Sequence, residues 1–119
     1  MRGSSRRPEQ VAENIRQVLA ELIGREVRDP RVGHATITRV EVTGDLSYAK
    51  VYVAVLGDEV EKEKAVEGLG SAAGFLRSKL ARVLTTRTVP QLTFELDRGL
   101  EHATRINTLL DQVNQERRD

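Results

Sequence analysis

An apolar stripe at helical spacing opens the chain just after Pro8. Its members are Val11, Ile15, Val18, Leu19, Leu22 and Ile23. This spacing is typical of a helix with one buried face, and proline suits the first helical turn because it has no amide hydrogen to leave unpaired. The stripe therefore predicts a helix that begins at Pro8 and ends between Gly24 and Arg28, ahead of the pair Asp29-Pro30.

A β-hairpin is predicted next. Residues 34–43 are rich in β-branched side chains, but the apolar positions of the first half fall out of phase with those of the second half. A bulge near Thr38-Arg39 brings them into one pattern. Turn residues follow at 43–45, and residues 49–55 then alternate between apolar and polar, as a strand with one buried face does. Lys50 lies on the polar side, where we interpret it as an edge charge that discourages pairing with another chain.

Two helices that meet at small residues are predicted between residues 58 and 84. Asp58 and Glu61 have the spacing of a capping box, which begins a helix. Gly68 and Gly70 weaken the end of this helix unless packing supports it. The joint consists of Ala72, Ala73 and Gly74. We expect the helix to kink there, and the small side chains to let another surface approach the backbone closely. Larger side chains at the kink are expected to damage packing.

A third strand and a closing helix complete the pattern. Leu92, Phe94 and Leu96 alternate as in a strand, and Asp97 is a suitable cap for a last helix. Its inward positions are Leu100, Ala103, Ile106, Leu110 and Val113. The order of elements predicts an α+β fold, with helices on one face of a three-stranded sheet. We expect one domain over residues 8–113, a flexible basic segment at 1–7 and a frayed tail at 114–119.

Composition narrows the classes of function. The 119 residues include no cysteine and no tryptophan, and only 3% are aromatic. Disulfides and thiolate metal sites are therefore excluded, and a platform of several aromatics for stacking bases is not expected. His34 and His102 are far apart, and no nucleophile-base pattern or nucleotide-binding loop occurs. We expect no metal, no cofactor and no enzymatic activity. With no apolar run long enough for a membrane span, a cytoplasmic protein is expected.

Charge is distributed unevenly, although the whole chain carries only +1. Residues 58–74 hold five acids and two lysines, whereas residues 75–90 hold four cations and no acid. These four cations are Arg77, Lys79, Arg82 and Arg87. A local cluster of this kind matters more than the total charge when the partner is a phosphate backbone.

Four motifs, in this order along the chain, resemble the ribosome-binding factor A family. They occupy residues 29–33 (DPRVG), 40–53 (VEVTGDLSYAKVYV), 72–77 (AAGFLR) and 87–94 (RTVPQLTF). The resemblance extends from about Arg6 to Leu110. It implies a KH-like fold of type II in which the usual Gly-rich loop is replaced by the Ala-x-Gly kink at Ala72–Gly74.

The resemblance also implies a function. Members of this family bind the immature small (30S) ribosomal subunit and its 16S rRNA, and they promote late rRNA maturation, including at low temperature. It implies assembly GTPases as possible partners, while the lack of a long apolar run predicts no membrane partner. We expect a monomer that acts by stabilising one conformation of ribosomal RNA. One alternative is a protein-interaction module of the same fold that acts mainly through a GTPase or a ribosomal protein, and another is a small enzyme on this scaffold.

Two groups of cations are the predicted RNA contacts. The first is the acid-free segment 75–90, with Arg77, Lys79, Arg82 and Arg87. The second surrounds the first helix and comprises Arg6, Arg7, Arg16, Arg28 and Arg31. An ordinary solvated helix face is the alternative for the first group. For the second, the interspersed acids, among them Glu13, Glu26 and Asp29, are the alternative partners.

Overall fold

The computed structural model describes residues 7–33, 35–84 and 88–99. Its elements, in chain order, are α1 (Pro8–Glu26), β1 (Ala35–Val42), β2 (Tyr48–Val55), α2 (Glu59–Ser71), α3 (Ala73–Val83) and β3 (Gln91–Leu96). The predicted helix from residue 97, the N-terminal segment up to Arg6, the tail 114–119, Arg87 and both histidines lie wholly or largely outside the described residues.

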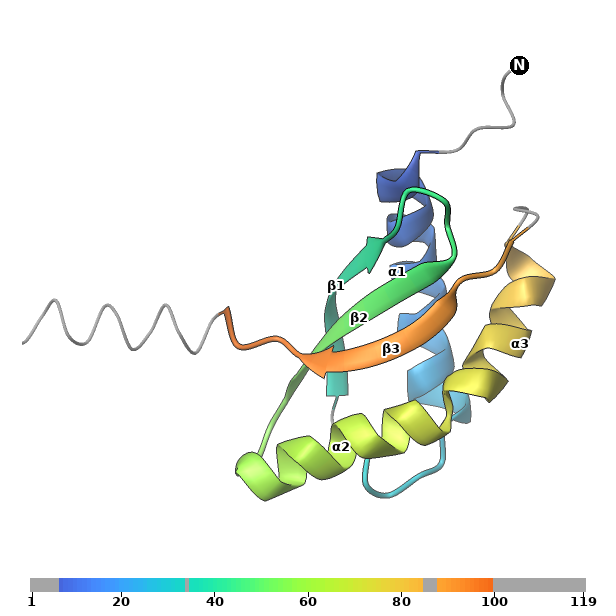
Figure 1. Ribbon diagram of the computed structural model, residues 1–119. Coiled ribbons are helices and arrows are strands. Elements are labelled where there is room, and N and C mark those ends of the chain that lie inside the picture. Colours follow the sequence, from blue (N-terminus) through green and yellow to red (C-terminus); the bar gives the residue numbers. More distant parts are fainter. Residues whose placement is uncertain (1–6, 34, 85–87, 100–119) are drawn as a thin grey trace, which may run out of the picture.

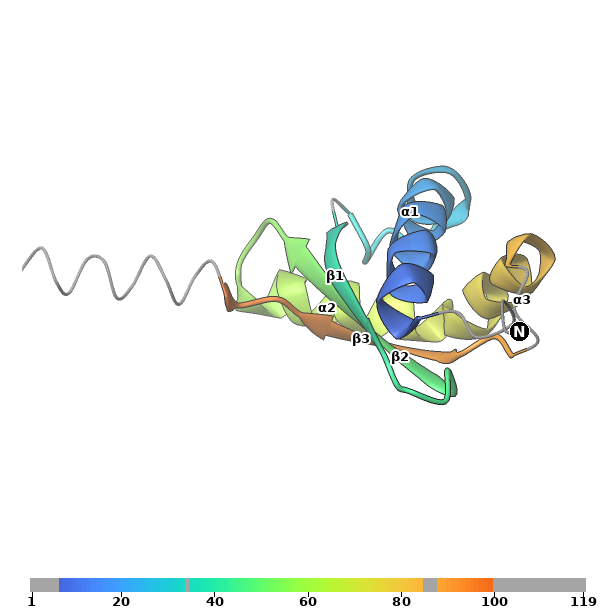
Figure 2. The same cartoon turned by 90° about the horizontal axis from the view of Figure 1, so that it is seen from above.

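The helices cover one face of a three-stranded sheet, as predicted (Figures 1 and 2). α1 lies over β1, while α2 and α3 lie over β3. Side chains of both layers meet in a single core. Its fully buried members include Ile15, Leu19, Val51, Val53, Leu69, Leu76 and Leu80. Burial of one such side chain contributes about 1.5–3 kcal/mol to stability. The helices therefore pack with their apolar stripes against the apolar face of the sheet, which gives the two layers.

The hairpin has the predicted irregularity. β1 and β2 pair antiparallel, and their register shifts between Ile37 and Arg39. This bulge returns the second half of β1 to the face that packs on the helices. Asp45 holds the connecting turn, because its Oδ1 accepts hydrogen bonds from Thr43 Oγ1 at 2.8 Å and from the Ser47 amide at 3.0 Å.

β2 is the central strand, since β3 pairs with it in parallel on the side opposite β1. Our interpretation of Lys50 as an edge charge is therefore wrong. Lys50 belongs to this central strand, and its Nζ lies 3.3 Å from Glu95 Oε2 of β3. The error arises because two helices separate β2 from β3 along the chain, so no local sequence pattern predicts that these two strands pair.

The joint between α2 and α3 is at Ala72, and the predicted kink is confirmed. Asp58 and Glu61 form the predicted capping box at the start of α2. α2 ends at Ser71, and Ala72, with φ −88° and ψ −2°, separates it from α3. Figure 1 shows the chain bending between these two helices. The bend lets one chain segment cover β3 and reach the end of α1.

Gly68 shows why α2 holds its helical form up to the kink. It is buried against the loop that follows α1. A Cβ atom at this position would lie 3.2 Å from Val32 Cγ2 and 3.3 Å from Arg31 Cβ. An added carbon would therefore require Val32 or Arg31 to shift, and this close contact with the loop supports the end of α2.

Candidate nucleic-acid interface

Three side chains that could serve recognition share one side of α3. Phe75, Lys79 and Arg82 are spaced by four and three residues, which places them in one row along a helix. The Lys79 ammonium lies 5.5 Å from the centroid of the Phe75 ring, a cation–π contact. Phe75 is 45% exposed although it is aromatic. Sequence analysis missed Phe75, and its spacing of four residues from Lys79 is the signal that could have found it.

Lys79 also faces a carboxylate. Its Nζ is 3.8 Å from Glu26 Oε2 in the last turn of α1. The pair connects the middle of α3 to the end of α1. In the folded protein, an acid from α1 therefore lies beside segment 75–90, which has none of its own. Arg82, one turn further along α3, is exposed and forms no ion pair with another described residue.

Arg77 lies on a different side of α3 and has a structural contact. Its Nε and Nη2 both donate to the Val89 carbonyl, at 3.1 and 3.0 Å. This fork holds the segment before β3 against the helix, so the structure does not group Arg77 with Lys79 and Arg82. Arg87 lies outside the described residues.

The second predicted group does not form one surface. Arg16 is bound by Glu13 one turn away, with Nε 3.0 Å from Oε2, and this hydrogen bond lowers the pKa of Glu13 below its ordinary value. Arg7 and Arg28 are exposed, and neither pairs with a described residue. Arg6 lies outside the described residues.

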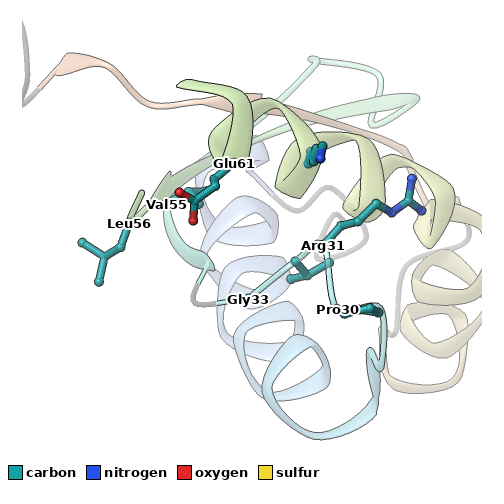
Figure 3. Close-up of a pocket in the computed structure, with 8 residues that line it drawn as sticks. Pro30, Arg31, Gly33, Val55, Leu56 and Glu61 are labelled. Atoms are coloured by element: carbon teal, nitrogen blue, oxygen red, sulfur yellow. The ribbon is translucent and has the colours of Figure 1, made fainter. Parts of the chain in front are cut away.

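Arg31 acts as a clamp between the loop after α1 and α2, because acids on both sides already bind it. It reaches from the loop toward α2 (Figure 3), where its Nη1 lies 3.2 Å from Glu67 Oε1. Its Nε donates to Asp29 Oδ1 at 3.0 Å, and its backbone amide donates to the same oxygen at 2.9 Å. The side-chain hydrogen bond, followed by that of the amide, lowers the pKa of Asp29 below its ordinary value. The clamp thus fixes the loop beside Gly68.

A hollow with a volume of about 230 Å³ lies between this loop and the start of α2; Figure 3 draws the residues that line it. Two of its charged side chains, Arg31 and Glu61, already serve the clamp and the capping box. Lys64 is the remaining charged side chain of the lining, so the hollow does not gather a set of unused polar groups around a ligand.

The glycines near the kink differ in what surrounds them. Cβ atoms added at Gly70 and Gly74 would meet nothing within 4 Å. Our expectation that a larger side chain at the kink damages packing is therefore wrong for the first added carbon at Gly74. Both positions leave open space where a side chain would stand, and the expected approach of another surface to the joint stays a prediction.

The open face of the sheet carries balanced charges. Arg39 lies 4.1 Å from the centroid of the Tyr52 ring and 3.3 Å from Glu41. The Tyr52 hydroxyl donates to Glu41 Oε1 at 2.8 Å, and this bond raises the pKa of the phenol above its ordinary value. Since each cation of this face has a carboxylate beside it, the face attracts phosphate less than α3 does.

Two observations bear on other kinds of site. Within the described ranges, no three His, Asp or Glu side chains are grouped so that they could hold a metal ion. None of the helices in these ranges is both long and apolar enough to cross a membrane.

Comparison with known proteins decides the family. The sequence model of the family described as ribosome-binding factor A matches residues 7–110. The chain belongs to this family. A ribosome-binding factor A from Desulforamulus reducens is 44% identical over 110 residues, which are 92% of this chain and 92% of the relative. One from Thermomicrobium roseum is 49% identical over 113 residues, 95% of this chain and 88% of the relative.

Solved structures of the ribosome-binding factor A family share the fold. The crystal structure of ribosome-binding factor A from Thermus thermophilus superposes with a TM-score of 0.68 at 30% identity, covering 77% of this chain and 98% of that one. A homology model of the Thermus thermophilus factor, fitted into a cryo-electron-microscopy map of its 30S complex, gives a TM-score of 0.64 at 31% identity, covering 76% and 94%. The expected KH-like α+β fold is thus confirmed.

Proposed function

We propose that this protein is an assembly factor that binds the immature small ribosomal subunit through its ribosomal RNA. The observation that carries the proposal is membership of the ribosome-binding factor A family over residues 7–110. A relative at 31% identity has been fitted into a map of a 30S complex, which supports the same partner for this chain. Because that partner is the ribosome, the protein acts in the cytoplasm.

The contact surface that we propose is the cationic face, defined as Arg28, Lys79 and Arg82. Neither Arg28 nor Arg82 forms an ion pair with a described carboxylate, so neither must break one before it meets a phosphate. Lys79 must leave Glu26, but at 3.8 Å this partly exposed pair is weak. Arg16, Arg31 and Arg77 contribute less, because each already holds a partner within the protein.

Binding itself is the proposed mechanism. A protein that contacts one arrangement of ribosomal RNA better than another shifts the RNA toward the first arrangement by the difference in binding free energy. Preference for the immature subunit would then promote late maturation, and it would matter more at low temperature, where misfolded RNA rearranges slowly. Such a role needs no catalytic residue. Assembly GTPases that alter the same RNA are natural partners, and a monomer suffices.

The salt dependence of binding to purified immature subunits tests this proposal. Each phosphate neutralised contributes about 0.7–0.9 to the slope of log affinity against log salt, so three cations give a slope of roughly −2 to −3. Arg82→Ala should make the slope shallower by about 0.7–0.9. Arg16→Ala is the matched control, since Glu13 already binds that guanidinium. A flat response to salt would instead favour a protein partner and contradict RNA binding.

A further inference from the structure

An exposed aromatic ring borders a groove at the kink. The groove has a volume of about 250 Å³ and lies between residues 26–29, at the end of α1, and the α2–α3 joint. Phe75 forms one wall, and the small residues Gly68, Ser71 and Ala72 line the groove along the joint. At 45% exposure, Phe75 keeps much of its ring in solvent. A single exposed apolar side chain is ordinary, so the surroundings of the ring must decide whether it has a role.

Of the charged side chains around the groove, Arg28 is the one that forms no ion pair with a described residue. Two acids line it, but Glu26 is paired with Lys79 and Asp29 with Arg31. Arg28 also lines it and pairs with no described residue. Lys79 contacts the Phe75 ring from one turn further along α3. A ligand that combines a flat ring with a phosphate would therefore meet an aromatic surface and cations together.

The backbone beside Phe75 is also open. Gly74 precedes it, and Gly70 lies one turn earlier, each with empty space where a side chain would stand. Glycine costs up to about 1 kcal/mol in a helix relative to alanine, and no neighbour among the described residues requires it at these positions. Packing among the described residues therefore does not account for glycine at these two positions, and it leaves space beside the helix for an external group.

We propose that an unpaired base of the ribosomal RNA stacks on Phe75 in this groove, while Arg28 and Lys79 contact the phosphates that flank it. The inference rests on the proposed function and adds its substrate class, namely a single-stranded segment rather than a duplex. Bases splayed out of a helix are recognised in this way, by stacking on an aromatic side chain. One ring suffices for one base, so the low aromatic content is compatible with it.

Substitution of the ring separates stacking from charge. Phe75→Leu keeps an apolar side chain but removes the aromatic face, and stacking of one base is commonly worth about five- to a hundredfold in affinity. We expect at least fivefold weaker binding to immature subunits, by the same factor at low and high salt, with the slope unchanged. Val83→Ala, at an apolar position of α3 that is 57% exposed, is the control and should bind as the unsubstituted protein does.

A tryptophan at the same position reports stacking directly. The chain has no tryptophan of its own, so Phe75→Trp introduces a single tryptophan, which can be excited apart from the two tyrosines, and keeps an aromatic ring. Titration with protein-free small-subunit rRNA should quench its fluorescence, whereas the fluorescence of Val83→Trp should change little. Phe75→Trp also keeps the test decisive if Phe75→Leu fails to fold, as circular dichroism would show.

The outcomes distinguish the two proposals. Stacking is overturned if the fluorescence of Phe75→Trp is not quenched, or if folded Phe75→Leu binds with full affinity. If Arg82→Ala still makes the slope of log affinity against log salt shallower, the proposed function stands. Full affinity of Phe75→Leu combined with loss for Phe75→Glu points to an apolar protein contact and equally overturns stacking. If the unsubstituted protein binds neither subunits nor rRNA, the proposed function fails together with this inference.

Discussion

The ammonium of Lys79 on α3 lies 3.8 Å from the carboxylate of Glu26 at the end of α1. The two side chains are about one-third exposed, at 33% and 37%, so the pair is screened and worth at most about 1 kcal/mol. A phosphate can compete with a carboxylate held this weakly. The pair therefore restrains Lys79 without removing it from the cationic face.

The first prediction concerns this competition. Glu26→Gln should strengthen binding to immature subunits by up to about fivefold at low salt, because about 1 kcal/mol of pairing no longer opposes the RNA. Glu21→Gln is the matched control: it removes the same charge from α1, and its pair with Arg25 is 3.9 Å long and highly exposed. Equal gains in the two variants would show that only net charge matters and would contradict a specific role for the pair.

Local chemistry accounts for most of what the sequence predicted correctly. The capping box at Asp58 and the hairpin turn at Asp45 depend on atoms a few residues apart, and the bulge in β1 follows from a change of phase within one strand. The kink at Ala72 lies in a run of small residues. Each of these features depends on residues that are close together in the sequence, so periodicity and turn chemistry suffice to predict it.

The partners of the predicted RNA contacts could not be found in this way. Lys79 and Glu26 are joined only when α3 packs beside α1, and Arg31 meets Glu67 only when the loop packs beside α2. The Arg77 bond goes to the carbonyl of Val89, and every residue has such a group, so no side-chain pattern marks it. Charge counts along the sequence therefore overstated how many cations are available to a phosphate.

The second prediction compares two neighbouring glycines of α2. Gly70→Ala should raise the free energy of unfolding by up to about 1 kcal/mol, since alanine favours the helix and nothing lies within 4 Å of the new carbon. Gly68→Ala should lower it by about 1 kcal/mol, because crowding against Val32 and Arg31 outweighs the helical gain. Urea denaturation measures both. Stabilisation of both variants would mean that the loop yields easily and that Gly68 is not required for packing.

The third prediction concerns pH. The Arg31 side chain, together with its backbone amide, lowers the pKa of Asp29 in the folded protein below its ordinary value of 3.8. A carboxyl group whose pKa is lowered by folding contributes stability above its unfolded pKa, and this contribution is lost as the pH falls through the folded pKa. The free energy of unfolding should therefore decrease as the pH is lowered below about 4.

Asp29→Asn tests the assignment of this acid sensitivity. The variant should be less stable than the unsubstituted protein at pH 6, and the difference between them should narrow as the pH falls toward 3, since only the unsubstituted protein then loses the ion pair. Urea midpoints measured across this range give the comparison. A constant difference at every pH would assign the loss to shape rather than to charge.

The fourth prediction separates Arg77 from Arg82, which the sequence placed in one group. Both Arg77 bonds go to the Val89 carbonyl, so Arg77→Met should lower the free energy of unfolding by about 1 kcal/mol and leave the salt slope of subunit binding unchanged. Arg82→Met should do the reverse, with unchanged stability and a slope shallower by about 0.7–0.9. Binding is measured below the unfolding temperature of both variants. A shallower slope for Arg77→Met would return Arg77 to the RNA contacts, because its guanidinium would then have to leave Val89 when the subunit binds.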